Sequence, residues 1–182
     1  MTLVERIVAL HRALRRRRIP HAFGGAIALA FATRDPRGTS DIDVNVFVPA
    51  DEAADALRAL PRAVGRPTDV LAVIERDGQI RLWWDDTPLD LFFDYAPIHG
   101  DAAAHRRTVP FGGTTIPVLG PVELAVFKAM SDRTRDWADI EAMLAAGTLD
   151  IDAVSRALSA MLPADDTRFS RLRTAQRLAD EA

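Results

Sequence analysis

The stretch GGAIALAFATRDPRGTSDID, from Gly24 to Asp43, decides the fold of this chain. Two glycines lead into a short apolar segment that predicts a helix, and a polar turn then leads to Asp41 and Asp43. The next residues, VNVFV at 44–48, predict a buried strand because β-branched and aromatic residues favour sheets. Side chains alternate along a strand, so the two aspartates are expected to point the same way.

This combination of glycines and paired acids indicates a nucleotide site. Gly24 and Gly25 have no side chains at the start of the predicted helix, where backbone N–H groups attract a phosphate. Asp41 and Asp43 repel each other unless a cation lies between them, and their hard oxygen ligands suit Mg²⁺. The alternative interpretation is a strand edge with two solvated acids.

Composition narrows the class of protein. With 182 residues, 48% hydrophobic and 27% charged, the chain is expected to form one globular domain, or one domain with a helical appendix. It has no apolar run long enough for a membrane span, and Glu5 and Arg6 interrupt any signal-peptide pattern. The absence of cysteine excludes disulfides and thiolate metal sites and fits a cytoplasmic protein. The net charge of −3 means that nucleic-acid binding would need local arginine patches.

The remaining elements follow from periodicity and turn signals. Helices are expected over 3–19, 49–60, from 121 onward, 151–162 and 166–181. Strands are expected over 70–75 and 80–84, joined by a turn at Asp77-Gly78, over 87–95, and in a hairpin over 108–119 with Gly112-Gly113 at its turn.

Asp90 is a candidate third acid of the site. It lies in the sequence TPLDLFFDY at 87–95, with apolar neighbours on both sides, so its carboxylate needs a partner. Beside Asp41 and Asp43 it would complete a metal site. Asp94 is on the same strand face but nearer the strand end, and Asp90 is preferred.

The basic residues are 22 arginines and a single lysine, Lys128, which either is there by chance or indicates that a compact ammonium is needed at that position. The arginine run at 15–18 either complements the dipole of the first helix or forms an RNA contact. His21 is expected to be a packing residue and not a base. The arginines between 168 and 177 predict a solvated or an RNA-facing helix surface.

The motifs at 24–43 resemble the signature of the nucleotidyltransferase superfamily: a glycine pair, a short helix and Asp-x-Asp on a strand. The version RGTSDID at 37–43 is similar to the AbiEii/MenT type of nucleotidyltransferase toxin. Fifteen residues separate Gly25 from Asp41, slightly more than this resemblance leads us to expect, and the surplus falls in the turn-rich segment 33–38. LDLFF at 89–93 is similar to the family's third-aspartate strand, and 121–140 is similar to its C-terminal motif, a helix with one lysine followed by an acid-bearing helix.

The resemblance implies an α/β (α+β) fold, in which a mixed β-sheet is flanked by helices. Residues 1–120 would form the nucleotidyltransferase-like catalytic core. Residues 121–182 would form a C-terminal helical region packed on the core as one compact unit.

The resemblance also implies roles for individual residues. The expected metal ligands are Asp41, Asp43 and Asp90, which would also be catalytic together with Lys128 and Asp136. The expected nucleotide-binding residues are Gly24, Gly25, Arg37, Ser40 and Lys128. Asp139 is the alternative to Asp136: it would share a face with Lys128 on an unbroken helix, whereas a break near Ser131 would favour Asp136. Thr39 is the expected site of regulatory phosphorylation.

The implied activity is Mg²⁺-dependent transfer of NMP from an NTP to RNA, namely the 3′ end of tRNA. The protein would inhibit growth as a toxin and be neutralised by a cognate antitoxin, which can be a kinase. One alternative is transfer to a small molecule, as in aminoglycoside adenylyltransferases, for which an acidic pocket would be expected. The other is a catalytically silent binding protein of the same fold.

Overall fold

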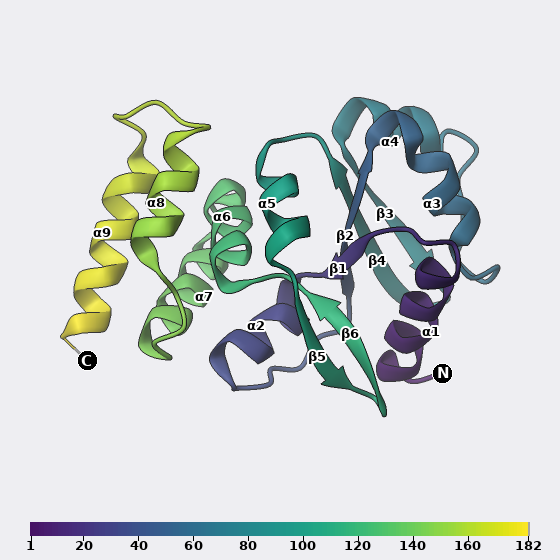
Figure 1. The fold of residues 1–182 in the computed structure, drawn as a ribbon, viewed down its shortest axis with the longest axis horizontal. Coiled ribbons are helices and arrows are strands. Elements are labelled where there is room, and N and C mark those ends of the chain that lie inside the picture. The colour runs from purple at the N-terminus through teal and green to yellow at the C-terminus, as the bar shows by residue number, and fades with distance from the viewer. Residues whose placement is uncertain (182) are drawn as a thin grey trace. The chain divides into compact units, whose positions relative to one another are not determined.

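The computed structural model describes residues 1–181, which contain one six-stranded mixed sheet, nine α-helices and one short 3-10 helix (Figure 1). The strands are β1 (His21–Phe23), β2 (Ile42–Pro49), β3 (Gln79–Trp84), β4 (Thr87–Asp94), β5 (Arg107–Phe111) and β6 (Thr114–Val118). The helices are α1 (Leu3–Arg16), α2 (Gly25–Thr33), η1 (Ala50–Glu52), α3 (Ala53–Ala59), α4 (Val70–Asp77), α5 (Ile98–His105), α6 (Pro121–Ser131), α7 (Thr134–Ala145), α8 (Ile151–Ser159) and α9 (Thr167–Asp180). This architecture confirms the predicted α/β class.

The chain divides into two units. The first comprises residues 1–27 and 38–119 and contains the whole sheet, and the second comprises 28–37 and 120–182. Helix α2 begins in the first unit and ends in the second. Within the described residues, none of the helices combines the length and the apolar character that a membrane crossing requires.

The first unit is built on the sheet, whose strand order is β3-β4-β2-β1-β6-β5. β2 pairs in parallel with β4, while β3 pairs antiparallel with β4, and β1 antiparallel with β2. Strand alternation buries Ile42, Val44, Leu89, Leu91 and Phe93 completely. The alternate side chains of β2 to β4 therefore lie on the opposite face, which carries the polar residues discussed below.

Helix α1 confirms the first predicted helix, although it ends at Arg16 and not near residue 19. Thr2 and Glu5 form a capping box at its N-terminus, and Arg18 adopts a left-handed conformation (φ 58°) just after its C-terminus. Buried Arg6 binds Asp85, Asp86 and Thr87 at the β3–β4 turn. These contacts fasten the helix to the hairpin.

The strand predicted over 70–75 is wrong, because these residues form helix α4. Gly78 (φ 66°) is its left-handed C-terminal cap, and its N–H donates to the carbonyl of Ile74 at 2.8 Å. The buried positions, Val70 and Ile74, lie four residues apart, which is the helical spacing. The β-branched residues suggested a strand, but tertiary burial of one helical face overrode that preference.

The actual hairpin turn before β4 is at Asp85-Asp86, because Trp84 pairs with Thr87. The predicted turn at Asp77-Gly78 is therefore wrong. The hairpin predicted over 108–119 is confirmed, with Gly112-Gly113 between the paired residues at its tip.

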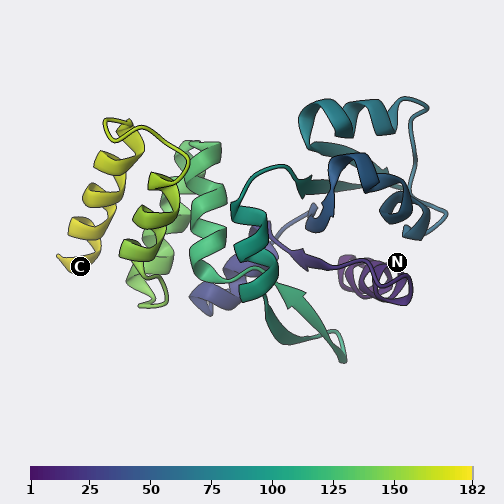
Figure 2. The same ribbon diagram turned by 45° about the horizontal axis from the view of Figure 1, so that its top comes forward.

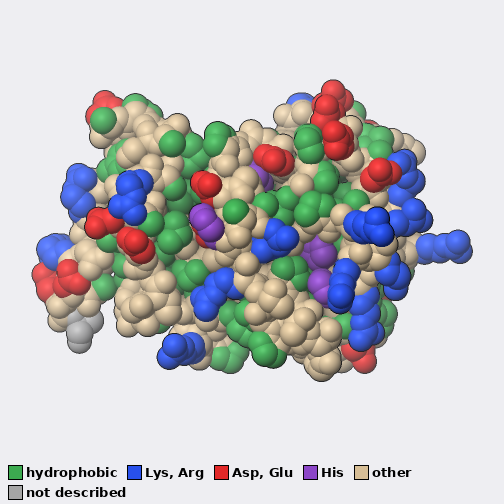
Figure 3. Space-filling view, in the orientation of Figure 1, with side chains coloured by type: hydrophobic (Ala, Val, Ile, Leu, Met, Phe, Trp, Pro, Cys, Tyr) green, Lys and Arg blue, Asp and Glu red, His purple; other side chains and the backbone are tan. Residues whose placement is uncertain are grey.

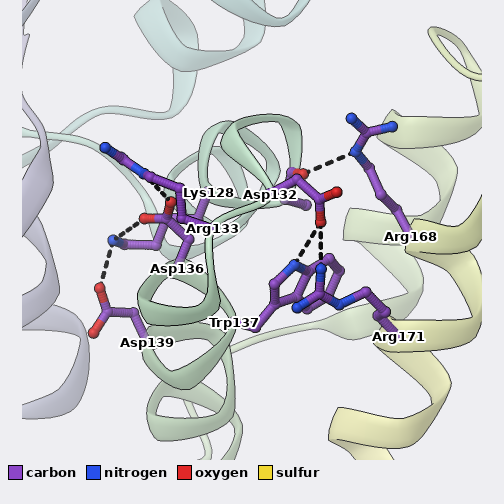
Figure 4. A network of polar contacts seen from close by, with 9 residues as sticks. Lys128, Asp132, Arg133, Asp136, Trp137, Asp139, Arg168 and Arg171 are labelled. Carbon is purple, nitrogen blue, oxygen red and sulfur yellow. Dashed lines mark hydrogen bonds and ion pairs between the residues drawn. The ribbon is translucent and has the colours of Figure 1, made fainter.

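Besides the end of α2, the second unit contains helices α6 to α9, which stand side by side (Figures 1 and 2). Asp132 adopts a left-handed conformation (φ 57°) and ends α6, and α7 starts two residues later. Arg171 of α9 donates to Asp132 at 2.6 Å and lies over the ring of Trp137, which also donates to Asp132 (Figure 4). Arg168 donates to the carbonyl of Ala129 at 3.0 Å. These two arginines hold α9 against its neighbours, so neither faces only solvent.

Candidate active site

Gly25 lies directly beneath the carboxylate of Asp43. Its φ is +49°, and a Cβ placed on it would lie 1.9 Å from Asp43 Oδ2. The preceding Gly24 donates its N–H to the carbonyl of Asp43 at 2.9 Å. Both the left-handed backbone and the close approach exclude a side chain at position 25. The glycine pair therefore seats the acid of β2 against the start of α2.

Asp43 and Asp90 are neighbours across the sheet. They are register partners on the parallel strands β2 and β4, and Arg81 of β3 is the register partner of Asp90 on its other side. Adjacent strands lie about 4.8 Å apart, so the three side chains form a row. Asp94, the alternative third acid, is opposite Pro49. The register thus brings Asp90, and not Asp94, beside Asp43.

Asp41 precedes β2 and is held by the turn before it. Its Oδ1 accepts hydrogen bonds from Thr39 Oγ1 at 2.9 Å and from Ser40 Oγ at 3.5 Å. Thr39 is half-buried, whereas Ser40 is exposed. We call Asp41, Asp43 and Asp90 together the acid face.

Arg81 is the cation of the acid face. Its Nε and Nη2 donate to the two carboxylate oxygens of Asp90 at 2.7 and 2.6 Å. The hydrogen bond from Arg81 to Asp90 and the charge of Asp90 raise the pKa of Arg81, and the charges of Asp41 and Asp43 raise it further. One guanidinium therefore interacts with three carboxylates.

The acid face has the donor chemistry for a hard divalent cation but not a ready three-acid site. Among the described residues, no group of three or more His, Cys, Asp or Glu side chains is arranged to hold a metal ion. Both oxygens of Asp90 bind Arg81. Carboxylate oxygens are the ligand type that Mg²⁺ prefers, so the chemistry of Asp41, Asp43 and Asp90 is compatible with the predicted ion.

A second cluster surrounds the single lysine (Figure 4). Lys128 Nζ, on α6, lies 2.6 Å from Asp139 Oδ2 and 3.3 Å from Asp136 Oδ1, both on α7. Arg133 binds Asp136 at 2.7 Å, and Arg37 binds Asp139 at 2.9 Å. The side chains of both acids are almost completely buried, at 6% and 4% exposure. We call these five residues the lysine cluster.

The break between α6 and α7 brings both candidate acids to Lys128, so neither Asp136 nor Asp139 is excluded by geometry. Burial raises the pKa of Asp136, but the hydrogen bond from Arg133 and the charge of Lys128 outweigh it and hold that pKa below its ordinary value. Arg37, predicted to bind nucleotide, contacts Asp139.

His21 has the packing role predicted for it. Its Nε2 lies 3.0 Å from Nδ1 of His11, and its Nδ1 lies 2.8 Å from the carbonyl of Ile19. Burial lowers the pKa of His21 to about 4, and the charges of His11 and Arg106 act in the same direction. The imidazole is therefore neutral at physiological pH.

The residue that the sequence analysis missed is Arg81. The signal for it was the turn position: a two-residue turn at Asp85-Asp86 pairs residue 81 with residue 90. With the turn predicted at Asp77-Gly78, the pairing of Arg81 with Asp90 could not be predicted.

Solved structures show the fold that these elements form. The structure of ANT(2″)-Ia in complex with adenylyl-2″-tobramycin has a TM-score of 0.54 and 15% identity, over 100% of this chain and 98% of that chain. An antigenic nucleotidyltransferase-like protein from Paracoccidioides brasiliensis has a TM-score of 0.47 and 16% identity, over 93% and 92% of the two chains. JHP933 from Helicobacter pylori has a TM-score of 0.45 and 14% identity, over 97% and 91%.

The first of these similarities shows a nucleotidyltransferase-like fold. No significant match is found among curated protein sequences. Residues 8–182 match the family described as nucleotidyl transferase AbiEii toxin, type IV toxin–antitoxin system. The chain therefore belongs to the AbiEii family of nucleotidyltransferase toxins.

Proposed function

We propose that this protein is a Mg²⁺-dependent nucleotidyltransferase that transfers NMP from an NTP to the 3′ end of tRNA. The observation that supports it most is the row of acids on one face of the sheet: Asp43 is next to Asp90 in register, and its carboxylate lies on a glycine that tolerates no side chain. Family membership supports nucleotidyl transfer and a toxin role. The acceptor and the metal are our proposal.

In this proposal, Asp41 and Asp43 hold Mg²⁺, which when bound supplies positive charge to the triphosphate. Asp90 would be a further metal ligand and would help to position and activate the acceptor hydroxyl. The hydroxyl oxygen bonds to the α-phosphorus, the bond from that phosphorus to the bridging oxygen breaks, and pyrophosphate leaves; the hydroxyl proton passes to solvent. Gly24, Gly25 and Ser40 donate to phosphate oxygens.

We assign two residues of the lysine cluster to phosphate binding. Lys128 and Arg37 carry the positive charges that the developing charge on pyrophosphate requires. Asp136 and Asp139 act by holding the ammonium in place, at 3.3 and 2.6 Å. They are positioning residues in this scheme.

A basic surface in the first unit favours a polyanionic acceptor. The arginines at 15–18 are exposed, and Figure 3 shows Lys and Arg side chains gathering near the N-terminal helix. Burial lowers the pKa of His11, and the charges of Arg15 and Arg12 lower it further, which shows that several cations act on this region. Such a surface attracts RNA phosphates and repels a polycationic aminoglycoside.

The experiment that tests the acceptor offers total RNA, purified tRNA and aminoglycosides in parallel, each with one labelled NTP and Mg²⁺. We expect label at the 3′ end of tRNA. We expect no label on tRNA whose terminal 2′,3′-diol was cleaved with periodate before the reaction. Label on an aminoglycoside alone would favour the alternative in which the acceptor is a small molecule. Aminoglycosides are included because the similar structure of ANT(2″)-Ia contains adenylyl-2″-tobramycin. No label on any acceptor would contradict the proposal.

We also propose Thr39 as the residue through which an antitoxin kinase inhibits the enzyme. Thr39 Oγ1 donates to Asp41 Oδ1 at 2.9 Å, so a phosphate there would replace a hydrogen-bond donor by an anion beside the acid face. Mass spectrometry of the protein co-expressed with its antitoxin is expected to find phosphate on Thr39 and not on exposed Ser40. Unmodified Thr39 in an inhibited sample would contradict this assignment.

A further inference from the structure

We propose that Arg81 is the built-in counter-ion of the acid face and competes with a divalent metal ion for Asp90. Metal binding and release of Arg81 from Asp90 are then a single exchange. The inference deepens the proposed function and rests on it, because it requires that the acid face binds a metal.

The geometry makes Arg81 a competitor and not a bystander. Its two donors engage both oxygens of Asp90 at 2.7 and 2.6 Å, the two-bond arrangement in which Arg–carboxylate pairs are strongest. A metal ligand must offer at least one of these oxygens to the ion. Because Asp43 is the register partner of Asp90 on the other side, an ion between the two acids would face Arg81 across one carboxylate.

The charge balance favours the exchange. The single positive charge of Arg81 interacts with Asp90 most strongly and also with Asp41 and Asp43. A divalent ion supplies twice that charge. Like charges on a metal ion and a guanidinium repel each other, so both are disfavoured on the same carboxylate.

Exposure decides which partner leaves. The Arg81 side chain is 53% exposed, whereas that of Asp90 is 16% exposed. β3 is at the end of the described sheet, so the guanidinium has solvent beside it. Arg81 can regain its hydration when it leaves, whereas Asp90 keeps its place on β4 and needs a new cation.

The first unit offers a matched control. Arg76 binds Asp77 through the same two nitrogens at 2.8 and 2.6 Å, and it is exposed. It lies on α4, and its pair involves no residue of the acid face. Removing either arginine deletes one two-bond Arg–Asp pair, but only one deletion frees a proposed metal ligand.

The test is calorimetric titration of Mn²⁺ into the full chain without nucleotide, for the unmodified protein, Arg81→Gln and Arg76→Gln. We expect Arg81→Gln to bind Mn²⁺ about fivefold more tightly, since a competing, partly exposed ion pair is lost. Arg76→Gln should bind like the unmodified protein. Mn²⁺ should also raise the Tm of Arg81→Gln more than that of the other two proteins.

Equal or weaker Mn²⁺ binding by Arg81→Gln would overturn the inference, because Arg81 would then be positioning Asp90 for the metal. No Mn²⁺ binding by any of the three proteins would instead overturn the proposed function, and this inference with it. Arg81→Lys keeps a positive charge but cannot form the two-bond pair, and it provides the test if Arg81→Gln does not fold. We expect its affinity to lie between those of the unmodified protein and Arg81→Gln, and affinity no tighter than the unmodified protein's would count against competition.

Discussion

The acid face and the lysine cluster both combine aspartates with basic side chains, but they differ in how deeply the aspartates are buried. At the acid face, three half-buried carboxylates interact with the exposed guanidinium of Arg81. In the lysine cluster, two buried carboxylates contact three cations: Lys128, Arg37 and Arg133. A buried charge needs an opposite charge or a hydrogen-bond partner beside it, whereas a partly exposed charge is stabilised by water.

The comparison separates function from stability. The carboxylates of the acid face are half-buried, so removing one of them strands no fully buried charge. The carboxylates of the lysine cluster are almost completely buried, so removing a cation from that cluster leaves a buried charge without its partner. Three variants test this distinction, and a change of pH tests the buried histidine pair; the four measurements are ordered by the size of the expected effect.

The largest effect is expected for Asp41→Ala. Nucleotidyl transfer should fall by about a thousandfold, equivalent to ~4 kcal/mol of transition-state stabilisation, because the proposed metal ligand is lost. The free energy of unfolding should stay within about 0.5 kcal/mol of the unmodified value, since the Asp41 side chain is only half-buried. Labelled-NTP transfer and urea unfolding measure the two quantities. Full activity would remove the acid face from the mechanism.

The next effect is expected for Lys128→Met, which should lower the free energy of unfolding by about 3 kcal/mol because Asp136 and Asp139 remain buried. Urea unfolding measures this loss. Adding Asp139→Asn should recover part of it, because the second change removes one uncompensated charge. Independent, additive losses in the double variant would contradict the compensation described here.

As the pH is lowered, the first loss of stability should come from the buried histidine pair and not from the acid face or the lysine cluster. The pKa of His21 is about 4 in the folded protein against an ordinary 6.5, so below pH 6.5 the unfolded chain gains a proton that the folded chain does not. Stability should fall by about 2 kcal/mol between pH 7 and 5 through this group. The lowered pKa of Asp136 supplies stability that is lost only as the pH falls below its ordinary 3.8.

Urea unfolding of His21→Gln at pH 7 and pH 5 checks this assignment. The pH-dependent loss of stability should shrink in the variant. Some dependence should remain, because burial also lowers the pKa values of His11 and His99. An unchanged loss would assign the pH dependence to other groups.

The smallest effect is expected for Arg133→Ala, at the rim of the lysine cluster. The Arg133 side chain is 75% exposed, so losing its pair with Asp136 should cost about 0.5 kcal/mol, much less than Lys128→Met. Urea unfolding at low and high salt measures the difference. If Arg133→Ala lowered the free energy of unfolding as much as Lys128→Met does, the exposed ion pair would stabilise the protein as much as the buried one, which would contradict this prediction.

Several features follow from the sequence alone because their causes are local. The glycine pair, the strand after Asp43, the Gly112-Gly113 hairpin and the helix beginning at Pro121 all carry short-range signals, and the structure has each of them. The sequence also indicated that position 25 needs a glycine. It did not show the reason, which is the Asp43 carboxylate next to it.

Local signals failed where distant residues decided the outcome. Val70, Val73 and Ile74 favour a strand, yet the segment is a helix because it buries Val70 and Ile74 on one side and ends at left-handed Gly78. Arginines 168 and 171 could not be distinguished from solvated residues until their partners across the helices were known.

Sequence by itself determined which residues carry charge and which segments present them: acids after a glycine-led helix, a third acid in an apolar strand, and one lysine on a late helix. Only the tertiary structure decided how those charges are compensated. Strand register placed Arg81 on Asp90, and the break after Ser131 placed two acids on Lys128. Compensation depends on distances between residues remote along the chain, and local periodicity does not encode those distances.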